Sequence, residues 1–377
     1  MQTLEIADLM TMARRRVPRM FFDYADSGSF TESTYRSNEI ELANIKVRQR
    51  VARQLSNRSL KTAMVGQPVA MPVALAPAGI AGMQHADGEI LAARAAARFG
   101  VPFTLSTMSV CSIEDVAAAT RAPFWFQLYV MKDRGFVGAL IDRAAAAGCS
   151  ALMVTLDLQL VGQRHKDIRN GLSTPPRLGP GTLRQLVSRP RWCLDMLRTR
   201  RRRLGNLVGY AKGAENLTSM SEWVASQFDL DFTWKDLDFI RRRWPGKLIL
   251  KGVLDPEDAR LAAETGADAV VVSNHGGRQL DGAPASIRKL PQVVEAVGDR
   301  IEVHFDGGIR SGQDVFRALA LGAHGTYIGR AYLYGLGAMG EAGVHRALSI
   351  IANELDITMA LCGERQVTDV GSHNLDS

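Results

Sequence analysis

The sequence predicts an α/β fold, a closed (β/α)8 TIM barrel with an N-terminal helical extension and a long insert after the fourth strand. From Val69 onward, short apolar runs alternate with longer Ala-rich amphipathic stretches, as in βα units around a parallel sheet. Eight such runs can be counted, which favours a closed barrel over an open sheet. Polar residues and glycines follow the runs, as expected where the strand ends of a barrel carry its chemistry.

The elements follow in order along one expected domain of residues 1–377. Residues 1–65 form the extension, whose helical pattern from Glu5 to Met20 is expected to cap one end of the barrel, and residues 66–371 form the barrel. The strands are expected at 71–76, 103–106, 124–129, 151–156, 247–251, 269–273, 301–306 and 325–329. About 90 residues separate the fourth strand from the fifth, far more than a crossover needs, so we expect an insert at 172–232.

The composition is that of an ordinary soluble enzyme, with 46% hydrophobic and 23% charged residues, and excludes a mostly disordered chain. The 4 cysteines show no C-x-x-C pairing, so neither a metal site nor a disulfide framework is expected. No apolar run approaches the roughly 18 residues of a membrane span, and the first residues do not read as a secretion signal. We therefore expect a cytoplasmic protein.

The most informative stretch is 273–282, Ser-Asn-His-Gly-Gly-Arg-Gln-Leu-Asp-Gly, directly after the sixth strand. Its paired glycines allow a tight turn beside a ligand, and His275 and Arg278 project from one short loop. Arg278 can hold a carboxylate by a bidentate pair while His275 takes a proton, which is what oxidation of a 2-hydroxy acid needs. The alternative is a structural turn with a surface histidine.

Two charged residues at other strand ends complete this hypothesis. Asp157 can orient His275 and stabilise its imidazolium form, or it can be an N-cap or a loop salt bridge. Lys251 lies in the barrel mouth, where it can stabilise negative charge on a reduced flavin. The alternative for Lys251 is an ion pair with Asp306 or another strand-end acid.

Two glycine turns after the seventh and eighth strands predict a phosphate site. They read Asp306-Gly307-Gly308-Ile309-Arg310 and Gly329-Arg330. Backbone N–H groups of such turns, a helix N-terminus and two guanidinium groups suit a phosphate at the usual position in this barrel. The pair implies a phosphate-bearing cofactor or substrate.

With these motifs the chain resembles the family of FMN-dependent 2-hydroxy acid oxidases and dehydrogenases, from Pro18 to about Ser372. The resemblance implies that His275 is the base, that Tyr24 and Arg278 bind the substrate carboxylate, that Tyr129 contacts the substrate oxygen and that Arg164 lies near the substrate. It assigns FMN contacts to Pro77, Ala78, Gly79, Ser106, Gln127, Thr155, Lys251, Ser273, Asp306, Gly307, Gly308, Arg310, Gly329 and Arg330.

Within the family, the stretches 104–111 and 204–206 are similar to the bacterial L-lactate dehydrogenases that pass electrons to a quinone or cytochrome. Met108, which helps to shape the side-chain pocket, favours lactate or a slightly larger acid over glycolate. The rivals are an oxidase that uses dioxygen, another FMN barrel enzyme, which would share the phosphate turns but would not need the His275 and Arg278 pair, and a membrane-binding scaffold without activity. A homo-oligomer, specifically a homotetramer, is also expected.

The net charge of +7 is concentrated in the insert, because residues 177–203 hold nine arginines and one acid, a charge of +8 that leaves −1 for the rest of the chain. Residues 180–203 interleave these arginines with Trp192 and leucines. This pattern suits a contact with a membrane surface, on the inner face of the cytoplasmic membrane, with Trp192 and the leucines in the interface. The alternative is a solvated lid over the active site; nucleic-acid binding is not expected.

Overall fold

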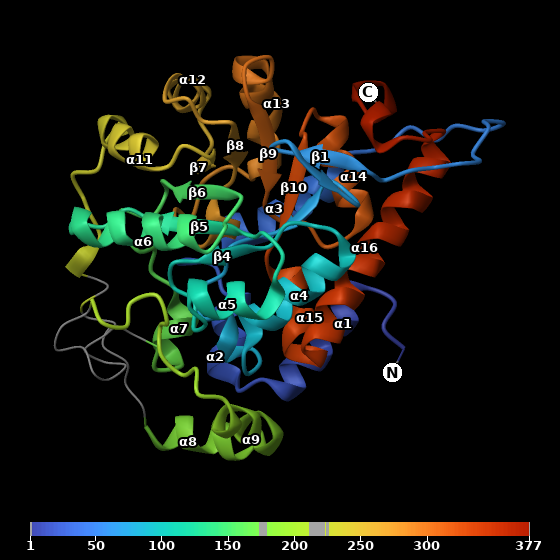
Figure 1. Cartoon of the computed structure of the whole chain (residues 1–377). Coiled ribbons are helices and arrows are strands. Elements are labelled where there is room, and N and C mark those ends of the chain that lie inside the picture. The colour runs from blue at the N-terminus through green and yellow to red at the C-terminus, as the bar shows by residue number, and fades with distance from the viewer. Residues whose placement is uncertain (1, 173–178, 211–222, 224–225, 377) are drawn as a thin grey trace.

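The computed structural model describes residues 2–172, 179–210, 223 and 226–376 and shows a closed α/β barrel surrounded by helices (Figure 1). Eight parallel strands form one sheet in the order β3-β10-β9-β8-β7-β6-β5-β4. The two ends of this sheet meet through a parallel bridge between Leu75 and Phe103. The predicted barrel fold is therefore confirmed.

The barrel strands are β3 (Val73–Leu75), β4 (Thr104–Ser106), β5 (Trp125–Tyr129), β6 (Ala151–Thr155), β7 (Lys247–Val253), β8 (Ala269–Val272), β9 (Glu302–Asp306) and β10 (Gly325–Ile328). The helices between and after them are α4 (Gly88–Phe99), α5 (Ile113–Thr120), α6 (Arg134–Ala146), α7 (His165–Arg169), α8 (Pro180–Val187), α9 (Pro190–Arg198), α11 (Leu237–Arg243), α12 (Pro256–Glu264), α13 (Ser286–Val297), α14 (Gly312–Ala320), α15 (Arg330–Met339) and α16 (Glu341–Cys362). Each expected strand is present, most of them shorter at the ends.

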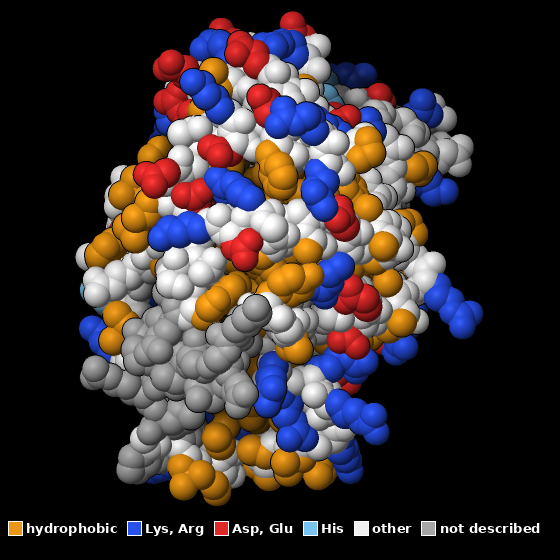
Figure 2. Space-filling view, turned by 60° about the vertical axis from the view of Figure 1, so that its left-hand side comes forward, with side chains coloured by type: hydrophobic (Ala, Val, Ile, Leu, Met, Phe, Trp, Pro, Cys, Tyr) orange, Lys and Arg blue, Asp and Glu red, His pale blue; other side chains and the backbone are white. Residues whose placement is uncertain are grey.

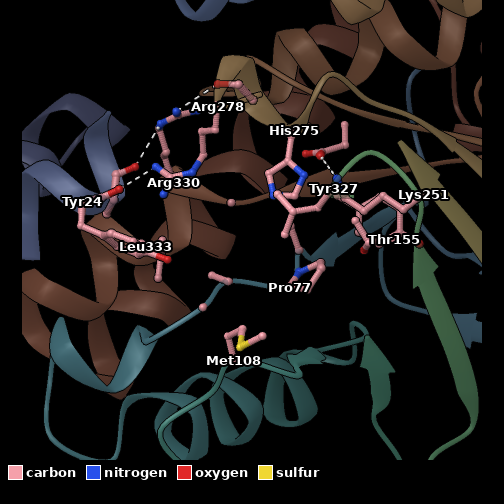
Figure 3. Close-up of a pocket in the computed structure, with 18 of the residues that line it drawn as sticks. Tyr24, Pro77, Met108, Thr155, Lys251, His275, Arg278, Tyr327, Arg330 and Leu333 are labelled. Carbon is pink, nitrogen blue, oxygen red and sulfur yellow. Dashed lines mark hydrogen bonds and ion pairs between the residues drawn. The ribbon is translucent and has the colours of Figure 1, made fainter. Parts of the chain in front are cut away.

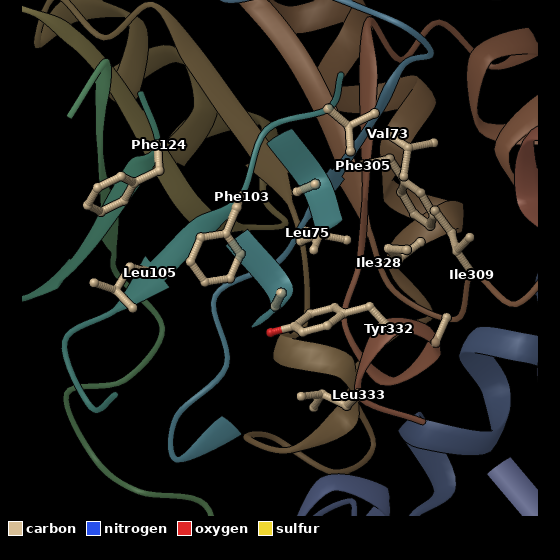
Figure 4. Packing of buried hydrophobic residues seen from close by; sticks show 14 of the residues in the cluster. Val73, Leu75, Phe103, Leu105, Phe124, Phe305, Ile309, Ile328, Tyr332 and Leu333 are labelled. Carbon is tan, nitrogen blue, oxygen red and sulfur yellow. The ribbon is translucent and has the colours of Figure 1, made fainter. Parts of the chain in front are cut away.

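Alternation along the strands divides the side chains into two apolar layers. On β3, Val73 and Leu75 face outward and pack with residues such as Phe103 and Phe305 beneath the helices (Figure 4). Ala74 faces inward and belongs to the cluster that fills the barrel, which includes Trp125. Because side chains alternate with a period of two, this alternation also determines which residues at the C-terminal strand ends face the inside of the barrel.

The N-terminal extension forms three helices, α1 (Ile6–Arg16), α2 (Arg19–Asp26) and α3 (Ser33–Asn44). The helical pattern expected from Glu5 to Met20 is present but interrupted, because the chain breaks between α1 and α2. Pro18 lacks an N–H and forces the residue before it out of helical geometry, and Val17 is extended at φ −83° and ψ 139°. The break turns α2 and α3 toward the C-terminal strand ends, where α3 packs on the turn at 275–277.

The opposite end of the barrel is closed by a hairpin of β1 (Thr62–Met64) and β2 (Gln67–Val69). Gln67 Oε1 accepts a hydrogen bond from Trp125 Nε1 at 3.1 Å, at the start of β5. Met64 is fully buried within the barrel cluster. The cavity described below therefore opens at the other end.

The basic region forms α8 and α9, which project from the lower end of the molecule in Figure 1. Its first arginine, Arg177, lies outside the described residues. Trp192 is half-buried: its ring stacks on Phe21 with centroids 5.3 Å apart, and its Nε1 donates to the Met83 carbonyl at 2.9 Å, so these contacts hold part of the side chain that was expected to meet a membrane. Among the described residues, no helix combines the length and apolar character needed to cross a bilayer.

Candidate active site

A cavity opens at the C-terminal ends of the barrel strands, with α2 and the insert along its rim. Figure 3 shows His275 between the side chains of Arg278 and Arg330 and those of Lys251 and Thr155. The predicted site residues that line it are Tyr24, Pro77, Ala78, Gly79, Tyr129, Thr155, Arg164, Lys251, His275, Arg278, Asp306, Gly307, Gly308, Arg310, Gly329 and Arg330. The structure thus brings most of the predicted set together in one space.

His275 is fixed by its turn and by one carboxylate. Its backbone φ of +58° is followed by positive φ at Gly276 and Gly277, so the turn needs glycine at both following positions. The Nδ1 atom of His275 lies 2.9 Å from Oδ1 of Asp157, while the ring faces the cavity. Asp157 itself lies behind the ring, outside the cavity lining.

The charge state of Asp157 suits this contact. Burial acts to raise the pKa of Asp157, but the charge and hydrogen bond of His275, with Lys251, outweigh it and hold the pKa below its usual value. Gly252 gives the carboxylate its room, since a Cβ there would lie 2.5 Å from Asp157 Cγ. The β7–β8 register shifts between Lys251 and Val253, at the same glycine.

The four residues assigned to the substrate gather on one side of His275. The guanidinium carbons of Arg278 and Arg164 lie 4.9 Å and 5.5 Å from the ring centre of Tyr24. Arg278 is held by the Tyr24 carbonyl at 2.6 Å, and Arg164 by Asp167 at 2.6 Å. Burial lowers the pKa of Arg278 to about 10, which leaves it a cation at neutral pH. Burial raises the pKa of the Tyr129 hydroxyl, so this group stays a neutral hydrogen-bond donor.

Lys251 forms an ion pair with Asp306, which was the alternative role given for this residue. Its Nζ lies 2.7 Å from Asp306 Oδ2 and donates to Ser273 Oγ at 2.8 Å. Ser273 in turn donates to Asp306 and accepts from the His275 N–H. The pair lines the cavity, so a buried cation is available there without an uncompensated charge.

The two glycine turns lie side by side, because β9 and β10 are paired. Gly307 and Gly308 adopt φ of +138° and +79°. The N-terminus of α14 is occupied, since Asp314 accepts from two backbone N–H groups and Glu354 from a third. The N-terminus of α15 has Gly329 at its N-cap and no side-chain cap. An anion would therefore meet the N–H groups of α15 rather than those of α14.

The two arginines of these turns are tied to the N-terminal helices. Arg310 donates to Glu39 at 2.8 Å, and Arg330 donates to the carbonyls of Ala25, Ser27 and Gly276. Both guanidinium groups still line the cavity. They bring positive charge to the rim while they anchor α2 and α3 over the strand ends.

The inward side chains on β5 and β6 leave two buried polar atoms without a partner in the structure, Gln127 Nε2 and Thr155 Oγ1. Gln127 Oε1 accepts from Ser106 Oγ at 3.2 Å, so its amide donor faces the barrel interior unpaired. Buried polar atoms without partners are rare and mark a place where a ligand supplies the missing bonds. A polar ring system such as isoalloxazine, with acceptors and donors along one edge, fits these atoms.

Sequence reasoning missed residues that come from distant segments. Leu204 and Phe228 of the insert line the cavity, and the Phe228 ring lies edge-on to Tyr129 with centroids 6.1 Å apart. Asn38 on α3 exchanges two hydrogen bonds of 2.8 Å with Asn274 and so holds the turn that carries His275. For Leu204 the only sequence signal was the similarity of the 204–206 stretch to bacterial L-lactate dehydrogenases. For Phe228 and Asn38 the sequence offered no signal.

Comparisons with known proteins agree with this geometry. The family model of FMN-dependent dehydrogenases matches residues 13–377. A protein of Caulobacter vibrioides named L-lactate dehydrogenase is 50% identical over 96% of this chain and 95% of its own length. One of the same name from Chromohalobacter salexigens is 46% identical over 98% and 94%.

Solved structures give the same result. The monotopic membrane protein (S)-mandelate dehydrogenase has a TM-score of 0.95 and 34% identity, with all of both chains covered. Mandelate oxidase has a TM-score of 0.84 and 34% identity over 100% of this chain and 98% of its own. The fold, the cavity and the full-length match lead to one conclusion: this chain belongs to the FMN-dependent dehydrogenase family.

Proposed function

We propose that this chain oxidises an L-2-hydroxy acid, most readily L-lactate, to the 2-oxo acid, with FMN as its cofactor. The observation that carries the proposal is the His275–Asp157 contact at 2.9 Å, set in the same cavity as Arg278, Tyr24 and Tyr129. Such a cavity suits a 2-hydroxy acid, because the fixed cations can bind the substrate carboxylate while the histidine, held by its own carboxylate partner, removes a proton.

The roles of the residues follow from where they lie. Arg278 and Arg164, with Tyr24, hold the substrate carboxylate, and the Tyr129 hydroxyl donates to a substrate oxygen. His275 takes a proton from the substrate through Nε2, because Nδ1 is engaged by Asp157. Asp157 stabilises the imidazolium that results.

FMN, when bound, supplies acceptance of the two electrons that leave the substrate α-carbon. The residues that would hold it are the inward and glycine positions of the strand ends: Pro77, Ala78, Gly79, Ser106, Gln127, Thr155, Lys251, Ser273, Asp306, Gly307, Gly308, Arg310, Gly329 and Arg330. Of these, Ser106, Gln127 and Ser273 lie outside the cavity lining. Gln127 carries an unpaired buried donor, and Ser273 positions Lys251.

The walls expected around the substrate side chain are apolar. Met108, Leu204 and Phe228 line this part of the cavity. An unbranched methionine adapts to several side chains. This lining supports lactate or a somewhat larger apolar 2-hydroxy acid, and it leaves mandelate as the second candidate substrate, which the names of the solved relatives also favour.

We further propose that the chain is a peripheral protein of the inner face of the cytoplasmic membrane and passes its electrons to a quinone or cytochrome. Four apolar side chains of α8 and α9 are exposed, at 64% for Leu183, 71% for Val187, 47% for Leu194 and 69% for Leu197. Figure 2 shows hydrophobic side chains gathered at the lower end of the molecule beside Lys and Arg side chains. Apolar residues rimmed by cations suit an interface with anionic lipid. The similarity to a monotopic membrane protein, (S)-mandelate dehydrogenase, supports a contact with a membrane.

A homo-oligomer, specifically a homotetramer, remains part of the proposal and is tested by light scattering of the purified protein. The central test of the function is whether L-lactate, without oxygen, bleaches the yellow colour of the purified protein. If L-lactate bleaches the protein and the reduced flavin is then reoxidised rapidly by dioxygen but not by a quinone, an oxidase would be favoured. A colourless protein that does not bind added FMN would favour a membrane-binding scaffold without activity.

A further inference from the structure

The segment of the insert that follows α9 returns to the barrel and docks on the loop after β4. Leu204 lines the cavity, and the Gly205 N–H donates to the Ser109 carbonyl at 3.0 Å. A Cβ on Gly205 would lie 2.6 Å from the Ser112 nitrogen, so only glycine allows this close approach. Residues 204–206 thus lie in close backbone contact with the loop at 106–112.

Asn206 fastens this contact with its side-chain amide, which is fully buried. Its Nδ2 donates to the carbonyls of Ser106 at 3.2 Å and Thr107 at 3.4 Å, and to Ser109 Oγ at 3.0 Å. Its Oδ1 accepts from the Ile113 N–H at 2.9 Å. A side chain that must donate to carbonyls and accept from an N–H in one place needs an amide.

The loop that Asn206 holds carries two parts of the site. Ser106 Oγ donates to Oε1 of Gln127 at 3.2 Å and accepts from the Met108 N–H at 3.1 Å, and the buried Nε2 of Gln127 has no partner. Met108 points into the cavity as a wall of the substrate pocket (Figure 3). The Asn206 amide therefore touches neither ligand but fixes the backbone from which both contacts are made.

We propose that Asn206 is a positioning residue for the active site, which sets the place of the 106–109 loop and hence of the Met108 wall. The inference rests on the proposed function for its substrate, but its geometry is independent of which 2-hydroxy acid is used. The contact of Asn206 also connects the insert to the site, since α9 ends at Arg198, a few residues before Leu204.

The test compares Asn206→Ala and Asn206→Asp with Asn374→Ala in the FMN-loaded enzyme. Asn374 is an equally buried asparagine (2% exposed) that binds Glu364 and the 371 N–H far from the cavity. We expect both Asn206 variants to lose about 10- to 100-fold in kcat/KM for L-lactate, because a misplacement of about 1 Å in an active site can cost about 100-fold. The ratio of kcat/KM for L-mandelate to L-lactate should rise as the Met108 wall loosens.

A second readout does not depend on turnover. The visible circular dichroism of bound FMN should change in the Asn206 variants and not in Asn374→Ala. Ser109→Ala, which removes one acceptor, should produce a smaller change that is not additive with Asn206→Ala, as expected for groups in contact. Asn206→Asp and Ser109→Ala keep the test valid if Asn206→Ala does not fold.

Two outcomes are distinguishable. If the Asn206 variants keep wild-type KM, substrate ratio and flavin dichroism, and lose only thermal stability as Asn374→Ala does, the positioning role is refuted. If instead the wild type is not reduced by any 2-hydroxy acid, the proposed function fails, while the flavin dichroism of the variants still decides the role of Asn206.

Discussion

His275 and Asp157 come from the ends of β8 and β6, 118 residues apart in sequence, and their side chains meet at 2.9 Å. The contact leaves the Nε2 of the imidazole as the free nitrogen on the cavity side. It therefore defines the direction in which a proton can be accepted, and the predictions below depend on it.

Replacement of His275 by alanine should abolish reduction of the flavin by substrate while FMN stays bound. Loss of a general base lowers a rate by about 100- to 10,000-fold, and the FMN contacts proposed above do not depend on the imidazole. Anaerobic stopped-flow absorbance measures the reduction, and the flavin-to-protein ratio after gel filtration measures binding. Unchanged reduction kinetics would refute the role of His275 as base.

The low pKa of Asp157 makes a prediction about stability and pH. An aspartate whose pKa is lower in the folded state stabilises the fold above its unfolded pKa of about 4, and this contribution is lost as the pH falls through the lower folded value. The free energy of unfolding of the wild type minus that of Asp157→Asn should therefore shrink as the pH falls below about 4.

Urea unfolding of the FMN-loaded proteins at a series of pH values measures this difference. Asp299→Asn, which removes the same charge from an exposed position, is the baseline variant. A difference that grows as the pH falls would mean that the His275 contact does not stabilise the carboxylate.

Replacement of Arg278 by lysine should raise KM for the 2-hydroxy acid. The planar guanidinium is braced by the Tyr24 and Ser27 carbonyls and can still present a second donor to a carboxylate, which the point charge of lysine cannot do. We expect kcat/KM to fall about 100-fold, in line with a loss of roughly 2.7 kcal/mol for a charge-assisted bidentate pair. Steady-state kinetics of Arg278→Lys measure both constants. A KM equal to that of the wild type would mean that the substrate carboxylate binds elsewhere.

Membrane contact predicts a loss of vesicle binding when the exposed apolar residues of α8 and α9 are made polar. In the variant Leu183→Ser/Val187→Ser/Leu194→Ser/Leu197→Ser, partition onto vesicles with anionic phospholipid should fall about 10-fold or more, because burial of one such side chain is worth about 1.5–3 kcal/mol. The matched control is Ile40→Ser/Val51→Ser/Ile357→Ser/Leu361→Ser, four exposed apolar positions elsewhere. Equal sedimentation of both variants with vesicles would contradict the surface contact.

Much of the fold was predictable because its signals are local. Each strand lies in a short apolar run, and inward polar residues at the strand ends follow from a period of two. The helix break at Pro18 was also readable from the sequence, since proline excludes the helical geometry of the residue before it. The expected pattern ran through this break because the hydrophobic spacing was given more weight than the proline.

The site was predictable where one turn carries several groups, as in 273–282, and where the family pattern supplies the partners. It was not predictable where the contact joins distant segments without a motif. Trp192 has the pattern of an interface anchor, but it is half-buried and contacts Phe21 and the Met83 carbonyl, which lie more than 100 residues away in the sequence. Phe228 and Asn38 reach the site for the same reason, through tertiary packing that no local pattern encodes.

The most direct measurement of the central claim is anaerobic reduction of the bound flavin by a panel of 2-hydroxy acids, namely L-lactate, D-lactate, glycolate and L-mandelate, in the wild type and in His275→Ala. We expect rapid bleaching by L-lactate, slower or no bleaching by D-lactate and glycolate, and no bleaching of His275→Ala by any of them. Flavin that stays oxidised in the wild type with every acid, or that is reduced equally in the variant, would contradict the central claim.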